Sequence, residues 1–192
     1  PKPSSAASDV YKRQDLVLDS ALMDSMYKEL YSILENNVDI IICETMSHSA
    51  EARSALASIQ GSKAQKWLSW TIYGNQNTLP SGETITEAFN VVSDLECDAY
   101  LINCGGANLI TEGIKELRPL TNKRIGGYGN SEKIEITNKD RSDRPEEDHW
   151  SAATAINENE YTEEVKVWVK EGATIVAGCC RTRPSHIKNM AA

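Results

Sequence analysis

The sequence predicts an α/β protein built on a parallel sheet, and two patterns support this prediction. Five short apolar runs typical of buried strands alternate with segments whose apolar residues recur at helical spacing. The predicted strands end near residues 44, 73, 104, 128 and 178, and most of the intervals are close to the ~30 residues of one βα unit. This repeat is compatible with an open doubly wound sheet or with a (β/α)8 barrel.

The first part of the chain predicts two helix–strand pairs. Residues 19–36 form a predicted helix that places four apolar side chains on one face, namely Leu22, Met26, Leu30 and Ile33. The run 38–43 is nearly all apolar and predicts a strand that is buried on both faces. Residues 47–60 predict the next helix, and a strand follows at 67–73.

The middle of the chain continues the alternation. Thr84 and Glu87 have the spacing of a capping box, which predicts the start of a helix. A strand is predicted at 99–104, directly before two glycines, and a helix at 108–118, where Pro119 prevents continuation. A weaker strand is predicted at 123–128.

The last part of the chain contains a charged segment and one more helix–strand pair. Residues 131–149 are rich in charged side chains and are predicted to be a solvated excursion. A helix is predicted at 161–171 and a strand at 173–178, which ends at two cysteines. At the other end, residues 1–14 show no apolar periodicity, so we expect a foreign-looking tail there and one domain over 15–192.

Composition narrows the possible partners. The net charge of −8 argues against binding to nucleic acid or to an anionic membrane surface. No stretch approaches the ~18 apolar residues of a membrane span. The odd number of cysteines does not suit a disulfide framework, and we expect a reducing, cytoplasmic location. The sequence does not determine the oligomeric state.

Cys104, Cys179 and Cys180 stand at the ends of two predicted strands. Functional side chains of parallel α/β folds gather at that edge of the sheet, so the three thiols can converge there. Three cysteine ligands with an open fourth position describe a catalytic zinc site. Taken without any further pattern, however, the three residues are also compatible with core packing or with thiol redox chemistry.

The motifs around these cysteines resemble those of the zinc-dependent homocysteine S-methyltransferase family. The segment GCCRTRPSHI at 178–187 is similar to the family signature GGCCRTTPxHI, although Ala177 and Arg183 depart from it. Four shorter segments resemble further family elements, namely INC at 102–104, CET at 43–45, LPSGET at 79–84 and GYGNS at 127–131.

The resemblance implies a (β/α)8 TIM barrel in which Cys104, Cys179 and Cys180 hold zinc and the homocysteine thiolate is the fourth ligand. It also implies that Glu44 binds the homocysteine amino group. Asn103 and Asn130 are further candidates for substrate binding. No residue is predicted to be a catalytic acid or base, and His186 is expected to pack behind the site.

The implied reaction is methyl transfer from a sulfonium donor, S-methylmethionine or S-adenosylmethionine, to homocysteine, which gives methionine. Its partners are therefore small molecules. Alternatives are betaine as the donor, or a zinc-binding barrel fragment that is not an enzyme. The resemblance covers only the C-terminal five βα units, so we expect an N-terminally truncated chain that does not close a barrel and has little activity alone.

Overall fold

The computed structural model describes four stretches of the 192-residue chain, namely 19–34, 37–72, 77–134 and 153–191. The predicted tail at 1–14 lies outside the described residues, as does most of the charged segment at 131–149. The account below is confined to the four described stretches.

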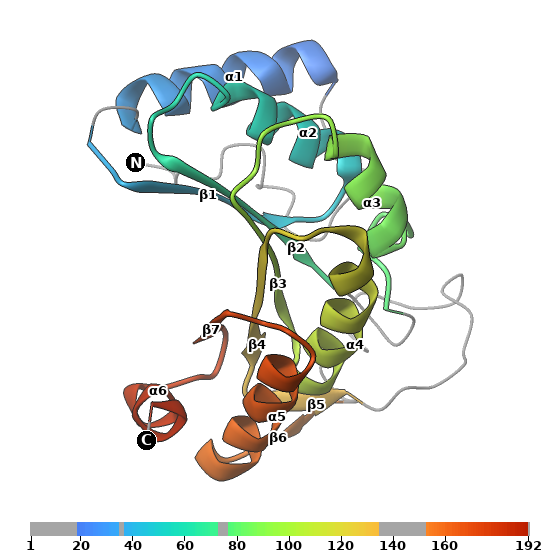
Figure 1. Cartoon of the computed structure of the whole chain (residues 1–192), viewed down its shortest axis with the longest axis vertical. Helices are drawn as coiled ribbons and strands as arrows, with labels where there is room; N and C mark the ends of the chain where they lie inside the picture. Colours follow the sequence, from blue (N-terminus) through green and yellow to red (C-terminus); the bar gives the residue numbers. More distant parts are fainter. Residues whose placement is uncertain (1–18, 35–36, 73–76, 135–152, 192) are drawn as a thin grey trace.

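A five-stranded parallel sheet forms the centre of the fold (Figure 1). Its strands are β1 (Ile40–Met46), β2 (Gln65–Thr71), β3 (Ala99–Gly106), β4 (Arg124–Asn130) and β7 (Ile175–Gly178). They pair in the order β1-β2-β3-β4-β7, which follows the chain. A doubly wound sheet reverses its strand order at a switch point, so the sequential order identifies a segment of a β/α barrel.

A second, two-stranded sheet was not predicted. β5 (Glu132–Ile134) pairs with β6 (Ala153–Ala155) in antiparallel register, directly after β4. The prediction of a solvated excursion was therefore wrong at the start of the charged segment, where Glu132 is buried. Charge alone suggested exposure, but this carboxylate has partners in the folded chain, as described below.

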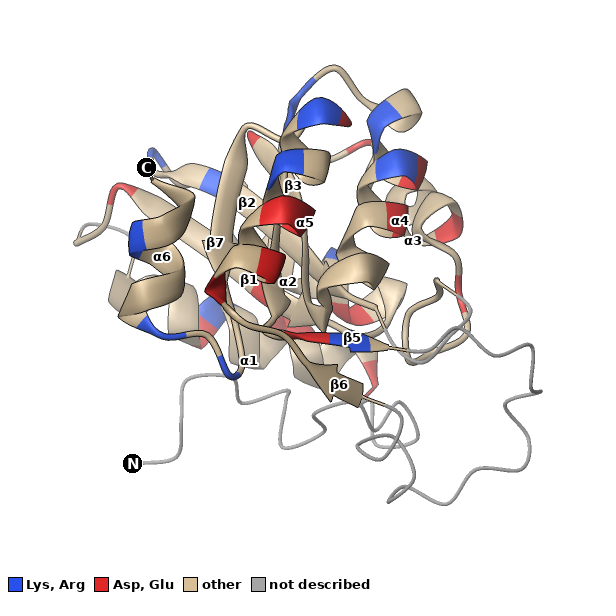
Figure 2. Ribbon diagram, turned by 90° about the horizontal axis from the view of Figure 1, so that it is seen from below, with Lys and Arg blue, Asp and Glu red and all other residues tan. Residues whose placement is uncertain are grey.

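In the four described stretches, six α-helices accompany the strands: α1 (Ser20–Leu34), α2 (Ser49–Ser58), α3 (Ile85–Val92), α4 (Ala107–Leu117), α5 (Glu158–Lys170) and α6 (Pro184–Met190). Helices α2 to α5 lie along one side of the curved sheet, and α1 packs on α2 (Figure 1). Acidic and basic side chains are interspersed over this outer layer (Figure 2). No helix among the described residues is both long and apolar enough to span a membrane.

The predicted capping box at the start of α3 is confirmed. Thr84 Oγ1 accepts a hydrogen bond from the Glu87 backbone N–H at 3.1 Å, and the Glu87 carboxylate accepts one from the Thr84 N–H at 2.8 Å. A second capping box, formed by Asn157 and Glu160, starts α5 earlier than the predicted residue 161. In both helices the side chains satisfy backbone donors that the first turn leaves without partners.

The main core lies between the sheet and the outer helices. Trp70 of β2 and Trp168 of α5 are fully buried there. Trp168 Nε1 donates to Thr111 Oγ1 at 3.0 Å and to the Ala107 carbonyl at 3.2 Å, so α5 is fixed against α4. This packing sets the position of β7, which follows α5 directly in the chain.

Two predictions about burial were wrong at the β1 end of the sheet. In α1 the fully buried residue is Met23, whereas Leu22 and Ile33 are exposed, because α1 faces α2 through Met23 and Tyr27. In β1 only alternate residues are buried, and Ile40 and Ile42 are about 40% exposed. The inner face of β1 lacks a covering element among the described residues.

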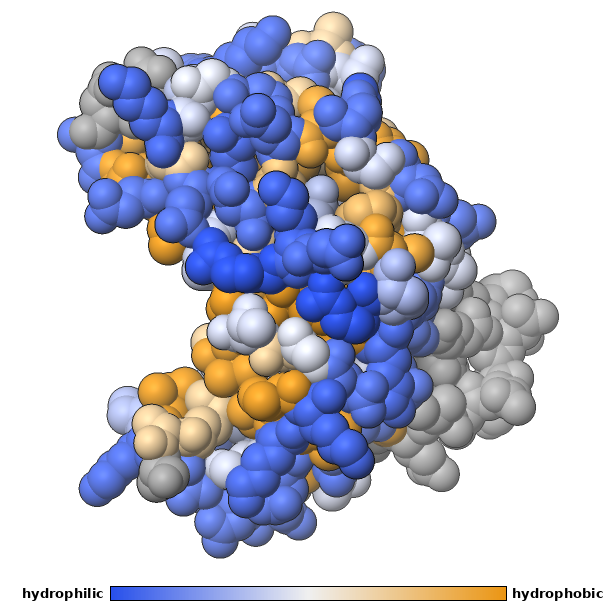
Figure 3. All heavy atoms as spheres, viewed as in Figure 1, coloured by the Kyte–Doolittle hydropathy of each residue, from blue (hydrophilic) through white to orange (hydrophobic). Residues whose placement is uncertain are grey.

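The sheet does not close into a barrel within the described chain, as expected. β1 and β7 form its two edges. The space-filling view is indented between the part that carries α1 and the part that carries α6, and apolar atoms line the lower side of the indentation (Figure 3). The concave side of the sheet therefore faces an open hollow.

Gly126 provides a test of the contact between β4 and β7. A Cβ atom at this position would lie 2.1 Å from the Ile175 carbonyl oxygen, which is backbone and cannot move aside. We expect Gly126→Ala to lower the free energy of unfolding by about 1–3 kcal/mol, the usual cost of overpacking. Urea unfolding measures this cost. Gly61→Ala is the control, because a Cβ there meets no atom within 4 Å; equal stability of the two variants would contradict the prediction.

Candidate metal centre

Three cysteine side chains from two distant segments meet at the carboxyl-terminal edge of the sheet. Cys104 lies in β3, whereas Cys179 and Cys180 follow directly after β7. Their Sγ atoms all lie within 4.8 Å of one another, and Cys104 Sγ is 3.9 Å from Cys180 Sγ. Cys104 is buried, Cys179 is half-buried and Cys180 is exposed, so one side of the cluster faces solvent. The structure thus brings together the three cysteines that the sequence singled out.

The backbone beside the cluster is strained. Cys104 has a φ of +56°, and the pairing of β3 with β4 is irregular between Asn103 and Gly106. Thr45 and Arg181 also lie in the left-handed region, with φ values of +60° and +64°. Such a conformation costs a residue other than glycine on the order of 1–3 kcal/mol, so the surrounding contacts must hold it.

The turn that carries Cys179 and Cys180 is held by the end of β4. The Cys179 backbone N–H donates to the Gly129 carbonyl at 2.8 Å, and the Cys180 N–H donates to Asn130 Oδ1 at 3.1 Å. The Ser131 N–H donates to the Cys180 carbonyl at 3.0 Å. β4 therefore continues its hydrogen bonding past the end of β7 and fixes the direction of both cysteines.

Asn130 links the two cysteine segments. Its side chain is buried, and Nδ2 donates to Glu132 Oε1 at 2.9 Å and lies 3.4 Å from the Cys104 carbonyl oxygen. Its Oδ1 accepts from the Cys180 N–H. The described contacts thus use both ends of the Asn130 amide within the protein, which makes it a link between the two cysteine turns.

Asn103 joins three strand ends in the same way. It is buried, its Oδ1 accepts from Ser69 Oγ of β2 at 2.7 Å, and its Nδ2 donates to Thr45 Oγ1 of β1 at 2.7 Å. Since Asn103 precedes Cys104 and Thr45 follows Glu44, this hydrogen bond couples the cysteine turn to the turn that carries Glu44.

Glu44 lies on the inner side of β1 and faces β4. Tyr128 Oη donates to Glu44 Oε1 at 3.1 Å. Burial raises the pKa of Tyr128, and the nearby charges of Glu44 and of Cys179 add to this effect, so the phenol stays protonated and serves as the donor. No other described residue hydrogen-bonds to the Glu44 carboxylate, which leaves acceptor capacity on an exposed group close to the cysteine cluster.

The electrostatics of the cluster favour a cation. Hydrogen bonding to Cys104, burial and the charges of the neighbouring thiols together raise the pKa of Cys179. Closely spaced thiolates repel one another, and a divalent cation between them removes that penalty because it stabilises each deprotonated sulfur. Among the described residues, the three cysteines form the only group of three or more His, Cys, Asp or Glu side chains spaced to hold a metal ion.

His186 packs behind the cluster, as expected. Its Nδ1 accepts from the Arg183 backbone N–H at 3.1 Å, and its Nε2 lies 2.9 Å from Ser131 Oγ. The Ser131 hydroxyl donates in turn to the Ile156 carbonyl at 2.6 Å. Nδ1 therefore caps the start of α6, whereas Nε2 ties α6 to the residue that follows β4.

Glu83 has a role that the sequence alone did not reveal. Its carboxylate accepts hydrogen bonds from the Ser49 N–H at 3.0 Å, from the Ser49 hydroxyl and from Ser81 Oγ at 2.6 Å. Burial opposes ionisation of Glu83, but these hydrogen bonds outweigh it and hold its pKa below the ordinary value. Glu83 thus joins the loop after β2 to the start of α2, next to the segment that follows Glu44.

Thr45, Tyr128 and Glu132 were also missed. A signal for Tyr128 exists, because it lies two residues before Asn130 in β4, and alternate residues of a strand share a face. Glu132 belongs to the separate strand β5, so this rule does not identify it. Thr45 belongs to the CET segment that resembles a family element, but nothing local to it identifies its partner Asn103, which is 58 residues away.

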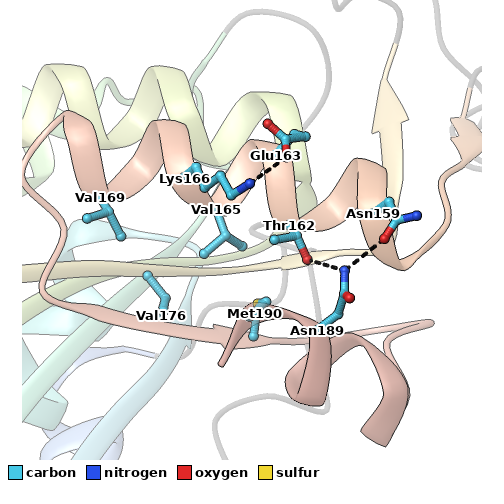
Figure 4. Close-up of a pocket in the computed structure, with 9 residues that line it drawn as sticks. All are labelled: Asn159, Thr162, Glu163, Val165, Lys166, Val169, Val176, Asn189 and Met190. Atoms are coloured by element: carbon cyan, nitrogen blue, oxygen red, sulfur yellow. Dashed lines mark hydrogen bonds and ion pairs between the residues drawn. The ribbon is translucent and has the colours of Figure 1, made fainter. Parts of the chain in front are cut away.

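A groove of about 480 Å³ lies elsewhere, between α5, β7 and α6 (Figure 4). Asn189 Nδ2 contacts Thr162 Oγ1 at 2.9 Å and Asn159 Oδ1 at 3.1 Å, and Lys166 pairs with Glu163. These polar side chains satisfy one another, and the lining contains none of the predicted site residues. We therefore assign the groove to the packing of α6 against α5 and not to the candidate site.

Comparisons with known proteins agree with this geometry. A family model described as homocysteine S-methyltransferase matches residues 3–192. The chain is 28% identical over 177 residues to a selenocysteine Se-methyltransferase of Brassica oleracea var. italica, and this match covers 91% of the chain and 49% of the relative. It is 27% identical over 177 residues to homocysteine S-methyltransferase 2 of Arabidopsis thaliana, covering 91% of the chain and 50% of that protein.

The metallated form of the homocysteine methyltransferase MmuM from Escherichia coli has a similar fold. The TM-score is 0.74 at 19% sequence identity, and the match covers 99% of this chain and 57% of that one. The chain therefore spans about half the length of the curated relatives that it matches.

The hydrogen bond between Asn103 and Thr45 can be tested by substitution. Thr45→Val keeps the branched shape but leaves a buried amide N–H of Asn103 without its acceptor, so we expect a loss of about 1–3 kcal/mol in the free energy of unfolding. Thr45→Ser retains the hydroxyl and is the matched control. Chemical denaturation of both variants provides the measurement, and a Val variant as stable as the Ser variant would refute the assignment.

Glu83 predicts a specific dependence of stability on pH. Its pKa is lowered in the folded state, so its contribution is present above the unfolded value of about 4.3 and is lost as the pH falls through the folded value. We expect Glu83→Gln to be less stable than the wild type at neutral pH and to lose less stability on acidification. Thermal unfolding between pH 7 and pH 3 tests this, and parallel pH profiles of the two proteins would exclude it.

Proposed function

The chain belongs to the homocysteine S-methyltransferase family, and from that premise we propose that its cysteine cluster binds zinc and supports methyl transfer from a sulfonium donor to homocysteine. The observation that carries this proposal is the convergence of Cys104, Cys179 and Cys180 within 4.8 Å at the edge of the sheet. Only part of the relatives' length is present, so the proposal concerns the thiol-binding portion of the reaction site.

The donor set fits zinc. Zinc bound tetrahedrally to thiolates at ~2.3 Å places two sulfur atoms ~3.8 Å apart. The Sγ atoms of Cys104 and Cys180 are 3.9 Å apart, with Cys179 close to both. Soft thiolates select zinc over harder cations. Three ligands leave a fourth position, and the exposure of Cys180 supports access to it from solvent.

Zinc, when bound, supplies the positive charge that keeps these cysteines and a substrate thiol deprotonated. Glu44 is suited to accept the ammonium group of homocysteine, since its carboxylate retains acceptor capacity near the cluster. Tyr128 orients Glu44 through its hydroxyl, 3.1 Å from Oε1. Asn103 and Asn130, proposed from the sequence as substrate contacts, are better suited to position the groups that bind substrate, because both amides are engaged within the protein.

The reaction itself needs no acid or base on the protein. The substrate thiolate attacks the methyl carbon of a sulfonium, the carbon–sulfur bond of the donor breaks, and two neutral thioethers result. Because charge is neutralised on the way to the transition state, a site sheltered from water accelerates the step. This charge balance requires a cationic methyl donor, and we propose a sulfonium, either S-methylmethionine or S-adenosylmethionine. The ammonium compound betaine meets the same requirement and is the alternative.

Zinc binding is the first test. We expect the purified chain to hold one zinc ion, and Cys104→Ser to lose most of it. Cys97→Ser is the control, because Cys97 is buried apart from the cluster and its Sγ contacts the Ala99 carbonyl at 3.1 Å. Elemental analysis after dialysis gives the stoichiometry. A chain with less than one zinc, or a Cys104→Ser variant that retains it, would overturn the metal site.

Substrate recognition is the second test. Homocysteine added to the cobalt-substituted chain should alter the visible absorption of the metal. Glu44→Gln should weaken this binding roughly 10- to 100-fold, which corresponds to loss of a charged hydrogen bond of about 1.5–3 kcal/mol. The control ligand is 4-mercaptobutyrate, which is homocysteine without its amino group and should bind both proteins equally.

Transfer of labelled methyl groups from S-methylmethionine, S-adenosylmethionine and betaine to homocysteine or selenocysteine then distinguishes donor and acceptor. Labelled methionine from a sulfonium donor supports the proposal. A metal spectrum that ignores homocysteine would instead identify a zinc-binding fragment without this function.

A further inference from the structure

Glu132, the first residue of β5, is a buried carboxylate beside the cysteine cluster. It is 4% exposed, and a carboxylate in such surroundings requires partners. The two carboxylate oxygen atoms of Glu132 have different partners. Oε1 accepts a hydrogen bond from Asn130 Nδ2 at 2.9 Å, and Oε2 lies 2.8 Å from Arg181 Nη1. The second contact is an ion pair without the alignment of a hydrogen bond.

Both partners of Glu132 lead directly to cysteine residues. Asn130 receives the Cys180 backbone N–H on Oδ1 and directs Nδ2 toward the Cys104 carbonyl. Arg181 follows Cys180 in the chain and has a φ of +64°, so its ion pair holds a strained residue within the turn. Glu132 therefore fixes groups on both sides of the gap between Cys104 and Cys180 without contacting sulfur itself.

The charge of Glu132 also decides which way the Asn130 amide points. A carboxylate only accepts hydrogen bonds, so it attracts the NH2 end of the amide and leaves Oδ1 toward the Cys180 N–H. If the amide were reversed, its NH2 group would face that N–H, donor against donor. The carboxylate thus selects the one orientation that supports the turn.

We propose that Glu132 is a positioning residue of the cysteine cluster, which sets the separation of Cys104 and Cys180 through Asn130 and Arg181. The inference rests on the proposed metal site and extends it to a residue outside the ligand set. Residues that orient metal ligands from outside the first coordination sphere typically contribute 10- to 100-fold in metal affinity. Glu132 is expected to act in this range.

The test compares two substitutions of similar carboxylates. Glu132→Gln preserves size but removes the charge and the acceptor-only character. Glu164→Gln is the matched control, because Glu164 is also largely buried and pairs with Lys133 Nζ at 2.6 Å, but it has no contact with the cysteine turns. Zinc affinity is measured on the full chain by competition with a chromophoric chelator, and cobalt spectra report the ligand geometry.

We expect Glu132→Gln to bind zinc about 10- to 100-fold more weakly and to shift the visible cobalt bands, whereas Glu164→Gln keeps the wild-type affinity and spectrum. Thermal unfolding of the metal-free proteins separates this effect from general destabilisation. If Glu132→Gln fails to fold, Arg181→Gln tests the same contact from its half-exposed partner, with the same loss expected.

Unchanged zinc affinity and cobalt spectra in the variants would overturn the role of Glu132, whereas the proposed function would stand on its zinc and homocysteine tests. A wild-type chain that binds no zinc would overturn both. A wild-type chain that binds zinc but does not respond to homocysteine would overturn the proposed function alone, and the role of Glu132 in the metal site would remain supported by its own comparison.

Discussion

The parallel register of β3, β4 and β7 is the constraint on which the cysteine cluster depends. Cys104 and Cys179 are 75 positions apart, and they meet because both strands end at the same edge and β4 pairs with each of them. A shift of one residue would turn every side chain of a strand to its opposite face. Cys104 would then point toward the outer helices instead of toward Cys180.

Two buried asparagines hold the strand ends of this register together at the cysteine cluster. Asn103 ties the ends of β1, β2 and β3 together, and Asn130 ties the end of β3 to the turn after β7. Their hydrogen bonds offset the strain of the left-handed residues Thr45, Cys104 and Arg181. Strain therefore lies where the strands end and side chains must leave the sheet, and the polar contacts that hold it lie in the same place.

The cluster and the open side of the sheet are separable features of this chain. The sulfur atoms need β3, β4 and β7, which pair with one another in parallel. The inner face of β1, by contrast, exposes Ile40 and Ile42 to the hollow. Proposed metal binding therefore depends on the pairing of these three strands, whereas methyl transfer also depends on how the hollow side of the sheet is covered.

The sequence alone determined the alternation of helices and strands, the capping box at Thr84 and the three cysteines, because periodicity, caps and motif spacing are local properties of the chain. The tertiary structure decided the rest. The partners of Glu44 and Asn103 lie 84 and 58 residues away, and β5 with its buried Glu132 lies in a segment whose charge predicted exposure. α1 offered more than one apolar face, and contact with α2 selected Met23. Hydrogen bonds between distant residues depend on strand register and helix packing, which exist only once the whole sheet has formed.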